Sequence, residues 1–228
     1  MSIEKLPGRP YRPEGTVYGV LLNSNDEFAA LSGQMTNPPY KAAPSAPVLY
    51  IKTANTWNPG GGVVVLPPQT AEISVGATIG MLIGAAAPVN RAPVAIDLIA
   101  GFVLLSDFSI PHASFFRPPV KFNCLDGFLG TAMQTVTPEQ AGNPAHLSVD
   151  VRINGELRQT VDFSQMRRNA AQLLVDVNEF MTLREGDVLM LGCGGGRPLA
   201  KAGDRVDISV SGVPAFGVLS HTLEEETR

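Results

Sequence analysis

The three histidines and two cysteines of this sequence, residue types that often act as proton shuttles and nucleophiles, lie far apart. His112, His146 and His221 are scattered without the partner spacing of a histidine-centred triad. Cys124 and Cys193 show no C-x-x-C spacing, so they predict neither a disulfide framework nor a zinc site. Cys193 could be a nucleophile only if a positive neighbour lowered its pKa, and a buried, inert thiol is the alternative.

A glycine-rich stretch at 192–196 runs directly into Arg197. It does not predict a dinucleotide-binding loop, because Arg197 occupies the place of a needed glycine and no βαβ unit surrounds it. An arginine can instead hold a carboxylate through two parallel hydrogen bonds. Lys52 and Arg117 are further cations of interest, and for all three residues a solvated surface position is the alternative.

Strands must position most of these residues. The 23 glycines and 19 prolines stand between short apolar runs, a pattern typical of sheets with many tight connections. Apolar and polar residues alternate over 147–153, which predicts a strand with one buried face, and Asn154-Gly155 predicts the hairpin turn after it. Other strands are predicted at 17–22, 48–51, 63–66, 77–84, 188–191 and 206–210, with turns at Gly186-Asp187 and Gly203-Asp204.

Helical spacing is clearest after Ser164, a predicted N-cap. The apolar face there consists of Ala170, Leu173, Leu174, Val177, Phe180 and Met181. Shorter helices are predicted over 26–31, behind the cap candidates Asn23 and Ser24, and over 94–100, ended by Gly101. The sequence therefore predicts a mainly β protein with a few helices, of the α+β class.

Composition limits the classes of function. The 228 residues, 44% of them apolar, predict one domain over 1–228 that includes a variable N-terminal segment at 1–46. A formal charge of −4 without a basic block argues against nucleic acid and against an anionic membrane surface. The start lacks the apolar core of a signal peptide, and the most apolar stretch, 79–89, is too short to cross a bilayer. We expect a cytoplasmic protein.

Three blocks of the sequence, taken in order, are similar to motifs of one protein family. Residues 47–52, Pro-Val-Leu-Tyr-Ile-Lys, are similar to the strand ending in Lys-Pro that opens the family's sheet core. Residues 99–109 resemble its Gly-Tyr-x-x-x-Asn-Asp-x-Ser strand. Residues 115–118 and then 126–128 resemble an aromatic-Arg-Pro to Asp-Gly-Phe run, and the chain after 151 follows the family's C-terminal order. Together these blocks resemble the fumarylacetoacetate hydrolase superfamily, and the resemblance covers nearly the whole chain.

The branch that the sequence most resembles is the isomerase/decarboxylase of 4-hydroxyphenylacetate (homoprotocatechuate) breakdown, and the likeness is to its N-terminal half or subunit. The resemblance implies a roll of small mixed sheets and a small, multiply carboxylated oxo-acid as substrate. It also implies a homodimer or a complex with a paralogous C-terminal-type subunit.

The resemblance further implies a divalent-cation site in active members, formed by two glutamates spaced Glu-x-Glu and the aspartate of the Asn-Asp-x-Ser strand. Residues i and i+2 of a strand share a face, so both carboxylates reach one ion. Here Gly76 and Thr78 occupy the glutamate positions and only Asp107 remains, as a remnant. We therefore expect no cofactor, with Mg²⁺ or Mn²⁺ bound weakly if at all. Asp107 could equally be a structural carboxylate that caps a turn.

Other family positions have changed as well. Asn123 replaces a lysine, and an amide can orient a carbonyl but supplies neither charge nor a proton. Glu27 and Ala30 replace a histidine and a glutamate of the first helix, so the usual acid/base pair is missing. The predicted catalytic residues are Asp107, Asn123 and Asp126, and the predicted substrate-binding residues are Lys52, Arg117 and Arg197.

Two functions remain open. The resemblance implies a 5-oxopent-3-ene-1,2,5-tricarboxylate decarboxylase / 2-hydroxyhepta-2,4-diene-1,7-dioate isomerase subunit of aromatic catabolism, with a degenerate metal site. Both steps pass through an enolate, which needs a cation as electron sink. Basic side chains and backbone N–H groups would suit a proton-shuttle isomerisation better than a decarboxylation. The alternative is a catalytically silent structural partner of a paralogous, metal-carrying subunit, which explains the missing ligands more simply.

Overall fold

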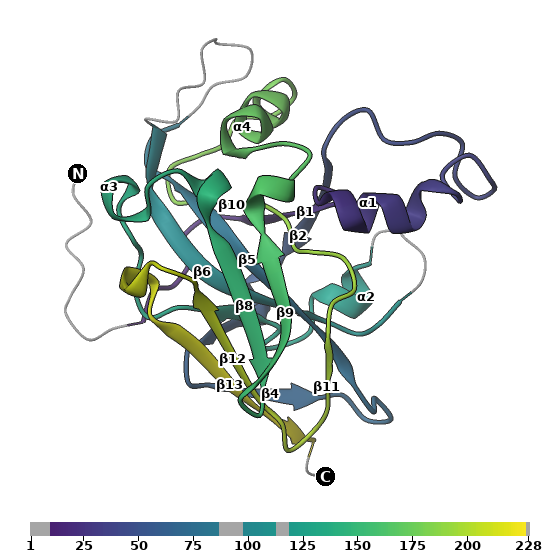
Figure 1. The fold of residues 1–228 in the computed structure, drawn as a ribbon, viewed down its shortest axis with the longest axis vertical. Helices are drawn as coiled ribbons and strands as arrows, with labels where there is room; N and C mark the ends of the chain where they lie inside the picture. The colour runs from purple at the N-terminus through teal and green to yellow at the C-terminus, as the bar shows by residue number, and fades with distance from the viewer. Residues whose placement is uncertain (1–9, 87–97, 113–118, 227–228) are drawn as a thin grey trace.

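Two β-sheets dominate the computed structural model, which describes residues 10–86, 98–112 and 119–226 (Figure 1). The larger sheet contains β1 (Val17–Leu21), β2 (Val48–Lys52), β3 (Trp57–Pro59), β5 (Ile73–Ile83), β6 (Ile99–Ser109), β7 (Leu129–Thr131), β10 (Val188–Met190) and β11 (Leu199–Ala200). Its order is β2-β1-β10-β5-β6-β7-β3, with β11 paired to β5. The smaller sheet contains β4 (Val63–Leu66), β8 (Ser148–Ile153), β9 (Glu156–Asp162), β12 (Arg205–Val210) and β13 (Val218–Glu225), in the order β4-β13-β12-β8-β9. The predicted mainly β class is confirmed.

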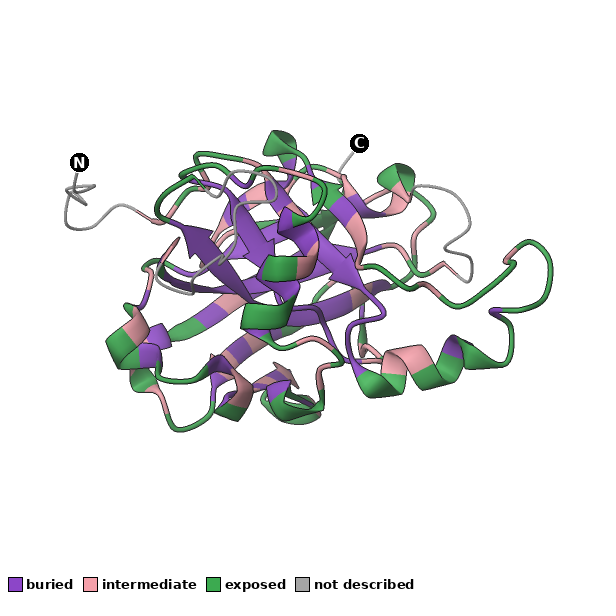
Figure 2. Cartoon of the chain, turned by 90° about the horizontal axis from the view of Figure 1, so that it is seen from above, coloured by how far each residue is buried: buried purple, intermediate pink, exposed green. Residues whose placement is uncertain are grey.

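The centre of the molecule is the antiparallel pair of β5 and β6, each 11 residues long. Both strands are buried on nearly every residue, and Figure 2 shows this continuous buried core between exposed outer elements. The smaller sheet packs against this pair through β8, β12 and β13. The register places Gly76 directly opposite Asp107. Because both strands are covered on both faces, any charged group here must find its partners inside the protein.

The smaller sheet carries the predicted alternation. β8 has apolar residues on its buried face and polar residues on the other, as the period of two requires. Asn154 and Gly155 follow with positive φ of 53° and 82°, the backbone of a two-residue hairpin turn, and the chain returns as β9. The predictions of this strand and its turn are confirmed.

Helix α1 (Asn25–Ser32) confirms the predicted first helix, with Ser24 as its N-cap. The longest helix, α4 (Ala170–Asn178), is capped by Asn169, whose side chain accepts from the N–H of Gln172. The predicted cap at Ser164 is wrong, because Ser164 lies in a separate 3₁₀ turn, Phe163–Gln165. The remaining helices are α2 (Val120–Asn123) and α3 (Pro138–Ala141), with 3₁₀ turns at Ala54–Thr56, Pro144–His146 and Pro214–Phe216.

Two further helix predictions need correction. Ala170, Leu173, Leu174 and Val177 form the buried face of α4, but Phe180 and Met181 lie beyond the end of the helix, and Phe180 is 55% exposed. The helix predicted over 94–100 is wrong at its end, because Ile99 and Ala100 begin β6, where Ile99 pairs with Ile83. Residues 94–97 lie outside the described part of the chain. Within that part, no helix is both long and apolar enough to cross a membrane.

Candidate functional site

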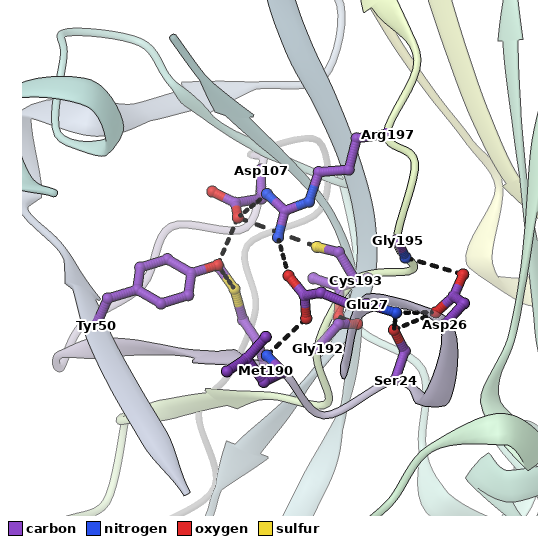
Figure 3. Close-up of polar contacts among 12 residues, drawn as sticks. Ser24, Asp26, Glu27, Tyr50, Asp107, Met190, Gly192, Cys193, Gly195 and Arg197 are labelled. Carbon is purple, nitrogen blue, oxygen red and sulfur yellow. Dashed lines mark hydrogen bonds and ion pairs between the residues drawn. The ribbon is translucent and has the colours of Figure 1, made fainter. Parts of the chain in front are cut away.

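A buried carboxylate, Asp107, lies at the centre of the site (Figure 3). Lys52 Nζ is 2.8 Å from Asp107 Oδ1, with both side chains at most 1% exposed. The Tyr50 hydroxyl donates to Asp107 Oδ2 at 2.5 Å, and Arg197 Nη1 lies 3.3 Å from the same oxygen. Since an unpaired buried charge is strongly unfavourable, these three donors explain how a charged aspartate is tolerated in the middle of β6.

Two of the donors come from one strand face. Tyr50 and Lys52 are separated by two positions on β2, so their side chains point the same way. The ring of Tyr50 lies over β1 where Gly19 leaves room, and a Cβ at Gly19 would be only 2.0 Å from that ring. The Lys52 ammonium also donates to the carbonyl oxygens of Phe108 at 3.0 Å and Asn123 at 2.6 Å, which occupies its hydrogen-bonding capacity.

The charges around Asp107 fix its protonation state. Burial would raise the pKa of Asp107, but the positive charges of Lys52 and Arg197 outweigh burial and lower that pKa. The carboxylate is therefore ionised at neutral pH. Burial and the neighbouring Asp107 charge raise the pKa of Tyr50 well above its usual value, so its hydroxyl stays a neutral donor. Asp107 does not cap a turn; it holds a buried charge cluster together on a central strand.

The glycine-rich stretch brings Arg197 to this cluster. The N–H of Gly195 donates to Asp26 at 3.0 Å, and Gln159 donates to the carbonyl oxygen of Gly195 at 2.7 Å. A Cβ at Gly195 would lie 2.8 Å from the backbone nitrogen of Glu27, so the stretch can dock on the start of α1 only with glycine here. These contacts fix the backbone just before Arg197.

Glu27 is the second carboxylate of the site. Its Oε2 accepts from the N–H of Leu22 at 2.6 Å, and its Oε1 lies 3.7 Å from Arg197 Nη2 (Figure 3). Burial raises the pKa of Glu27, although the positive charge of Arg197 opposes this. Sequence reasoning assigned no role to Glu27 or to Tyr50. Tyr50 could have been noticed, since it shares a strand face with Lys52, whereas the approach of Glu27 to Arg197 depends on the tertiary fold.

A cavity of about 290 Å³ opens beside Arg197 and Glu27. Its other polar lining residues include Asn123, Ser74, Ser109 and His112, and Leu21, Ala30 and Leu31 make part of it apolar. Asn123 is only 5% exposed, and its Oδ1 has no hydrogen-bond partner among the described residues. The guanidinium of Arg197 suits a carboxylate, and the unpaired amide oxygen of Asn123 can accept from a hydroxyl, so the partly apolar cavity suits a small ligand that carries both groups.

The structure thus places Asn123 and Arg197 in one cavity, with Asp107 directly behind Arg197. Asp126 is not brought to this place: it is exposed, and its carboxylate accepts from Asn55 at 2.6 Å. Lys52 lines a different, larger cavity of about 820 Å³, and its ammonium is turned to Asp107. Arg117 lies outside the described residues.

The side chains present do not fit a divalent cation. A Cβ at Gly76 would lie 2.8 Å from the Asp107 carbonyl oxygen, 2.9 Å from Cys193 Sγ and 3.2 Å from Arg197 Nη1, so the space for a longer side chain there is filled. The Thr78 hydroxyl donates to the carbonyl oxygen of Gly192 at 2.7 Å. Across residues 10–86, 98–112 and 119–226, no three His, Cys, Asp or Glu side chains are grouped as metal ligands would be. Of the three positions where the resemblance implies metal ligands, only Asp107 carries a carboxylate, and its direct charged partners are the cations Lys52 and Arg197.

Cys193 borders this cluster, with its Sγ 4.0 Å from Asp107 Oδ2. Burial raises the pKa of its thiol to about 12, despite the opposing charge of Arg197. The nearby positive charge therefore does not yield a thiolate at neutral pH, and the geometry favours an inert thiol over a nucleophile.

Comparisons with known proteins agree on one family. Residues 16–224 match the family model described as fumarylacetoacetate (FAA) hydrolase C-terminal. The chain is similar to the 4-hydroxyphenylacetate degradation bifunctional isomerase/decarboxylase of Salmonella dublin, with 35% identity over 203 residues that make up 89% of this chain and 46% of the relative. The protein of the same name from Escherichia coli is 36% identical over 201 residues, which are 88% of this chain and 46% of the relative. The chain thus spans about half the length of these curated relatives.

A solved structure shares the fold. Fumarylpyruvate hydrolase from Pseudomonas aeruginosa, in complex with Mn²⁺ and pyruvate, superposes with a TM-score of 0.76 at 20% identity, covering 99% of this chain and 100% of that one. The 2-hydroxyhepta-2,4-diene-1,7-dioate isomerase of Mycobacterium marinum superposes with a TM-score of 0.75 at 20% identity, over 95% of this chain and 77% of that one. The family model, the relatives and the fold agree that the chain belongs to the fumarylacetoacetate hydrolase family.

Proposed function

We propose that this chain is the N-terminal-type half of a 4-hydroxyphenylacetate-pathway isomerase/decarboxylase, and that it isomerises a carboxylated dienol such as 2-hydroxyhepta-2,4-diene-1,7-dioate. The observation that carries the proposal is the placement of Arg197, which is held by buried Asp107 and lines a cavity with Asn123. The similarity to relatives of that name supports the substrate class.

The proposed chemistry needs a positive group where negative charge develops. Ketonisation of a dienol passes through an enolate, and a fixed cation in a site with little water stabilises an enolate by several kcal/mol. Arg197 is in place to supply this charge, since its contacts to Asp107 and Glu27, at 3.3 and 3.7 Å, are longer than tight charge-assisted hydrogen bonds. Its N–H donors therefore retain capacity for a substrate carboxylate or enolate.

We propose that this centre works without a divalent cation. Lys52 and Arg197 supply positive charge beside Asp107, where the resemblance puts a metal ion. This arrangement suits a proton-transfer isomerisation. Decarboxylation makes a larger demand on the electron sink, so we assign that step to a paralogous subunit.

Association with such a subunit is part of the proposal. The relatives are about twice as long as this chain, so a second half of comparable size is expected either as a paralogue or as another copy of this chain. The paralogue would carry the metal-dependent activity.

One assay tests the function. The purified chain, its paralogue and their mixture are each given 2-hydroxyhepta-2,4-diene-1,7-dioate with Mg²⁺ or with a chelator, and loss of dienol absorbance is followed. The proposal expects isomerisation by this chain, or by its mixture with the paralogue, that survives the chelator and falls at least ~100-fold in an Arg197→Gln variant. Turnover that needs Mg²⁺ and ignores Arg197→Gln contradicts it.

A second candidate is a catalytically silent partner of the paralogue. The observation in its favour is that Lys52 is completely buried and paired inside the protein, so the cluster could serve stability alone. In the same assay, this candidate expects a mixture more active or more stable than the paralogue alone, with full sensitivity to chelator and none to Arg197→Gln.

A further inference from the structure

We infer that Glu27 is a catalytic residue of this chain, the group that carries the proton during isomerisation of a substrate whose carboxylate is held by Arg197. The inference rests on the proposed isomerase function and deepens it. Glu27 stands where the resemblance implies a histidine, and its own side chain lines the cavity beside Arg197.

The position of Glu27 is set by three independent contacts. Ser24 caps α1 and its hydroxyl accepts from the N–H of Glu27 at 3.3 Å, which fixes the first turn of the helix. One carboxylate oxygen is anchored on the N–H of Leu22. The other oxygen is 3.7 Å from Arg197 and bounds the cavity, so it is the oxygen that a ligand can meet.

The surroundings of Glu27 suit a base that works near neutral pH. The side chain is only 11% exposed, and burial favours its uncharged form, while the guanidinium opposite favours the carboxylate. Among the described residues, the other titratable and charged groups around it are Asp26 on α1, Asp107 on β6, His112 across the cavity, and Cys193 and Arg197 on the glycine-rich stretch. Tyr50 and Lys52 on β2 reach this group only through Asp107.

Two of the neighbouring groups, Asp107 and Cys193, are poorer proton carriers. Asp107 is held by Lys52, Arg197 and Tyr50, which lower its pKa and leave it a weak base. Cys193 is a buried thiol. His112 also lines the cavity, with its Nδ1 at 2.9 Å from the Ile110 carbonyl oxygen, and is the group from which an experiment must distinguish Glu27.

The step balances without any further reagent. With the C1 carboxylate of the dienol at Arg197, the Glu27 carboxylate takes the proton of the C2 hydroxyl, and the O–H electron pair forms the C2 carbonyl. The C2–C3 double bond moves to C3–C4, and the electrons of the C4–C5 double bond take a proton at C5 from the Glu27 carboxyl group. One proton leaves oxygen and one enters carbon, so the product is an isomer and nothing is oxidised or reduced.

The test is the Glu27→Gln variant. An amide keeps the size of the side chain and an oxygen that accepts from Leu22, but it cannot carry the proton. We expect kcat to fall at least ~100-fold with KM little changed, because general acid–base groups contribute factors of that size. In the wild type, kcat should decrease at low pH as Glu27 becomes protonated, and this acid limb of the pH profile should be absent in the variant. NMR of the wild-type reaction in D₂O should find deuterium at C5 of the product.

Matched variants decide the outcome. Glu139 also lies in the first turn of a helix, α3, but is exposed and outside the cavity, so Glu139→Gln should keep the wild-type kcat. Glu27→Asp retains a carboxylate and should therefore keep part of the activity. It tests the inference even if the Glu27→Gln variant folds poorly. Full activity of folded Glu27→Gln, or an acid limb that disappears only in His112→Gln, overturns the inference and leaves the proposed function standing. A wild-type chain inactive both alone and with its paralogue overturns both.

Discussion

At the scale of single residues, the negative charge of the buried carboxylate Asp107 must be compensated by its neighbours. Asp107 meets an ammonium, a guanidinium and a phenol in a place that water barely reaches. A pocket with this donor set attracts a carboxylate and repels a free cation. Each of the three partners should therefore contribute to stability as well as to binding.

Removing the Lys52 ammonium tests how far the stability of the protein depends on this compensation of Asp107. A Lys52→Met variant keeps the apolar stem but leaves Asp107 with part of its charge unbalanced, and we expect the free energy of unfolding to fall by about 3 kcal/mol. Urea denaturation followed by circular dichroism measures it. Lys121→Met, at an exposed position on α2, serves as the control and should change the free energy by less than about 0.5 kcal/mol. Equal stability of the two variants would contradict the buried-pair account.

His221 offers a pH-dependent test. Burial lowers the pKa of His221, although its hydrogen bond to the Gly62 carbonyl oxygen opposes this. The unfolded chain therefore binds a proton more readily than the folded one, so the free energy of unfolding should fall as pH drops below about 6.5. His221→Gln should lose less stability than the wild type between pH 8 and pH 5 in urea denaturation. Exposed His146→Gln should behave as the wild type does; a wild-type slope in His221→Gln would refute the assignment.

The sequence predicts part of this site. Asp107 and Asn123 lie at positions marked by the family resemblance, and Arg197 follows the glycine-rich stretch. The fold brings Arg197 to Asp107 and into one cavity with Asn123. Glu27 was not predicted, because the end of a glycine-rich stretch and the start of a helix meet only in the folded chain. Asp126 was predicted from its neighbouring motif, but its side chain points to Asn55 at the surface. Such orientation is decided by packing and cannot be derived from spacing.

At the scale of elements, the strand over 147–153 and its turn were predicted, whereas helix ends and some strands, among them β7 and β13, were not. The period of two along β8 and the positive-φ turn after it are local properties, so they can be derived from sequence. The cap of α4 could not be chosen correctly, because Ser164 and Asn169 are both good N-cap types and tertiary contacts decide between them. The start of β6 was missed at Ile99 because its partner, β5, lies elsewhere in the chain.

The packing of β1 against β2 gives a prediction at this scale. A Gly19→Ala variant places a methyl group where the Tyr50 ring lies, so the ring must move away from Asp107, and we expect a loss of about 1–3 kcal/mol in stability. Gly33→Ala is the matched control, because nothing lies within 4 Å of a Cβ there and its φ of −66° suits alanine. Thermal unfolding of the two variants compares them, and an unchanged midpoint for Gly19→Ala would show that Tyr50 is not held as described.

At the scale of the whole molecule, the charge cluster is carried by the larger sheet, with Tyr50 and Lys52 on β2 and Asp107 on β6. Its cavity is lined by residues of α1 and of the glycine-rich stretch before Arg197, which Figure 3 shows beside Asp107. The chain matches the fumarylacetoacetate hydrolase family over 16–224 but spans about half of its curated relatives. We propose that the two halves divide the work: this chain supplies the fixed cations Lys52 and Arg197, and a paralogue supplies the metal site.

The most direct test of this division is a titration of the purified chain with Mn²⁺, followed by electron paramagnetic resonance. With the protein at millimolar concentration, we predict that the signal of free Mn²⁺ is undiminished, because Lys52 and Arg197 already surround Asp107 with positive charge. Binding of one ion per chain that disappears in an Asp107→Asn variant would contradict the account.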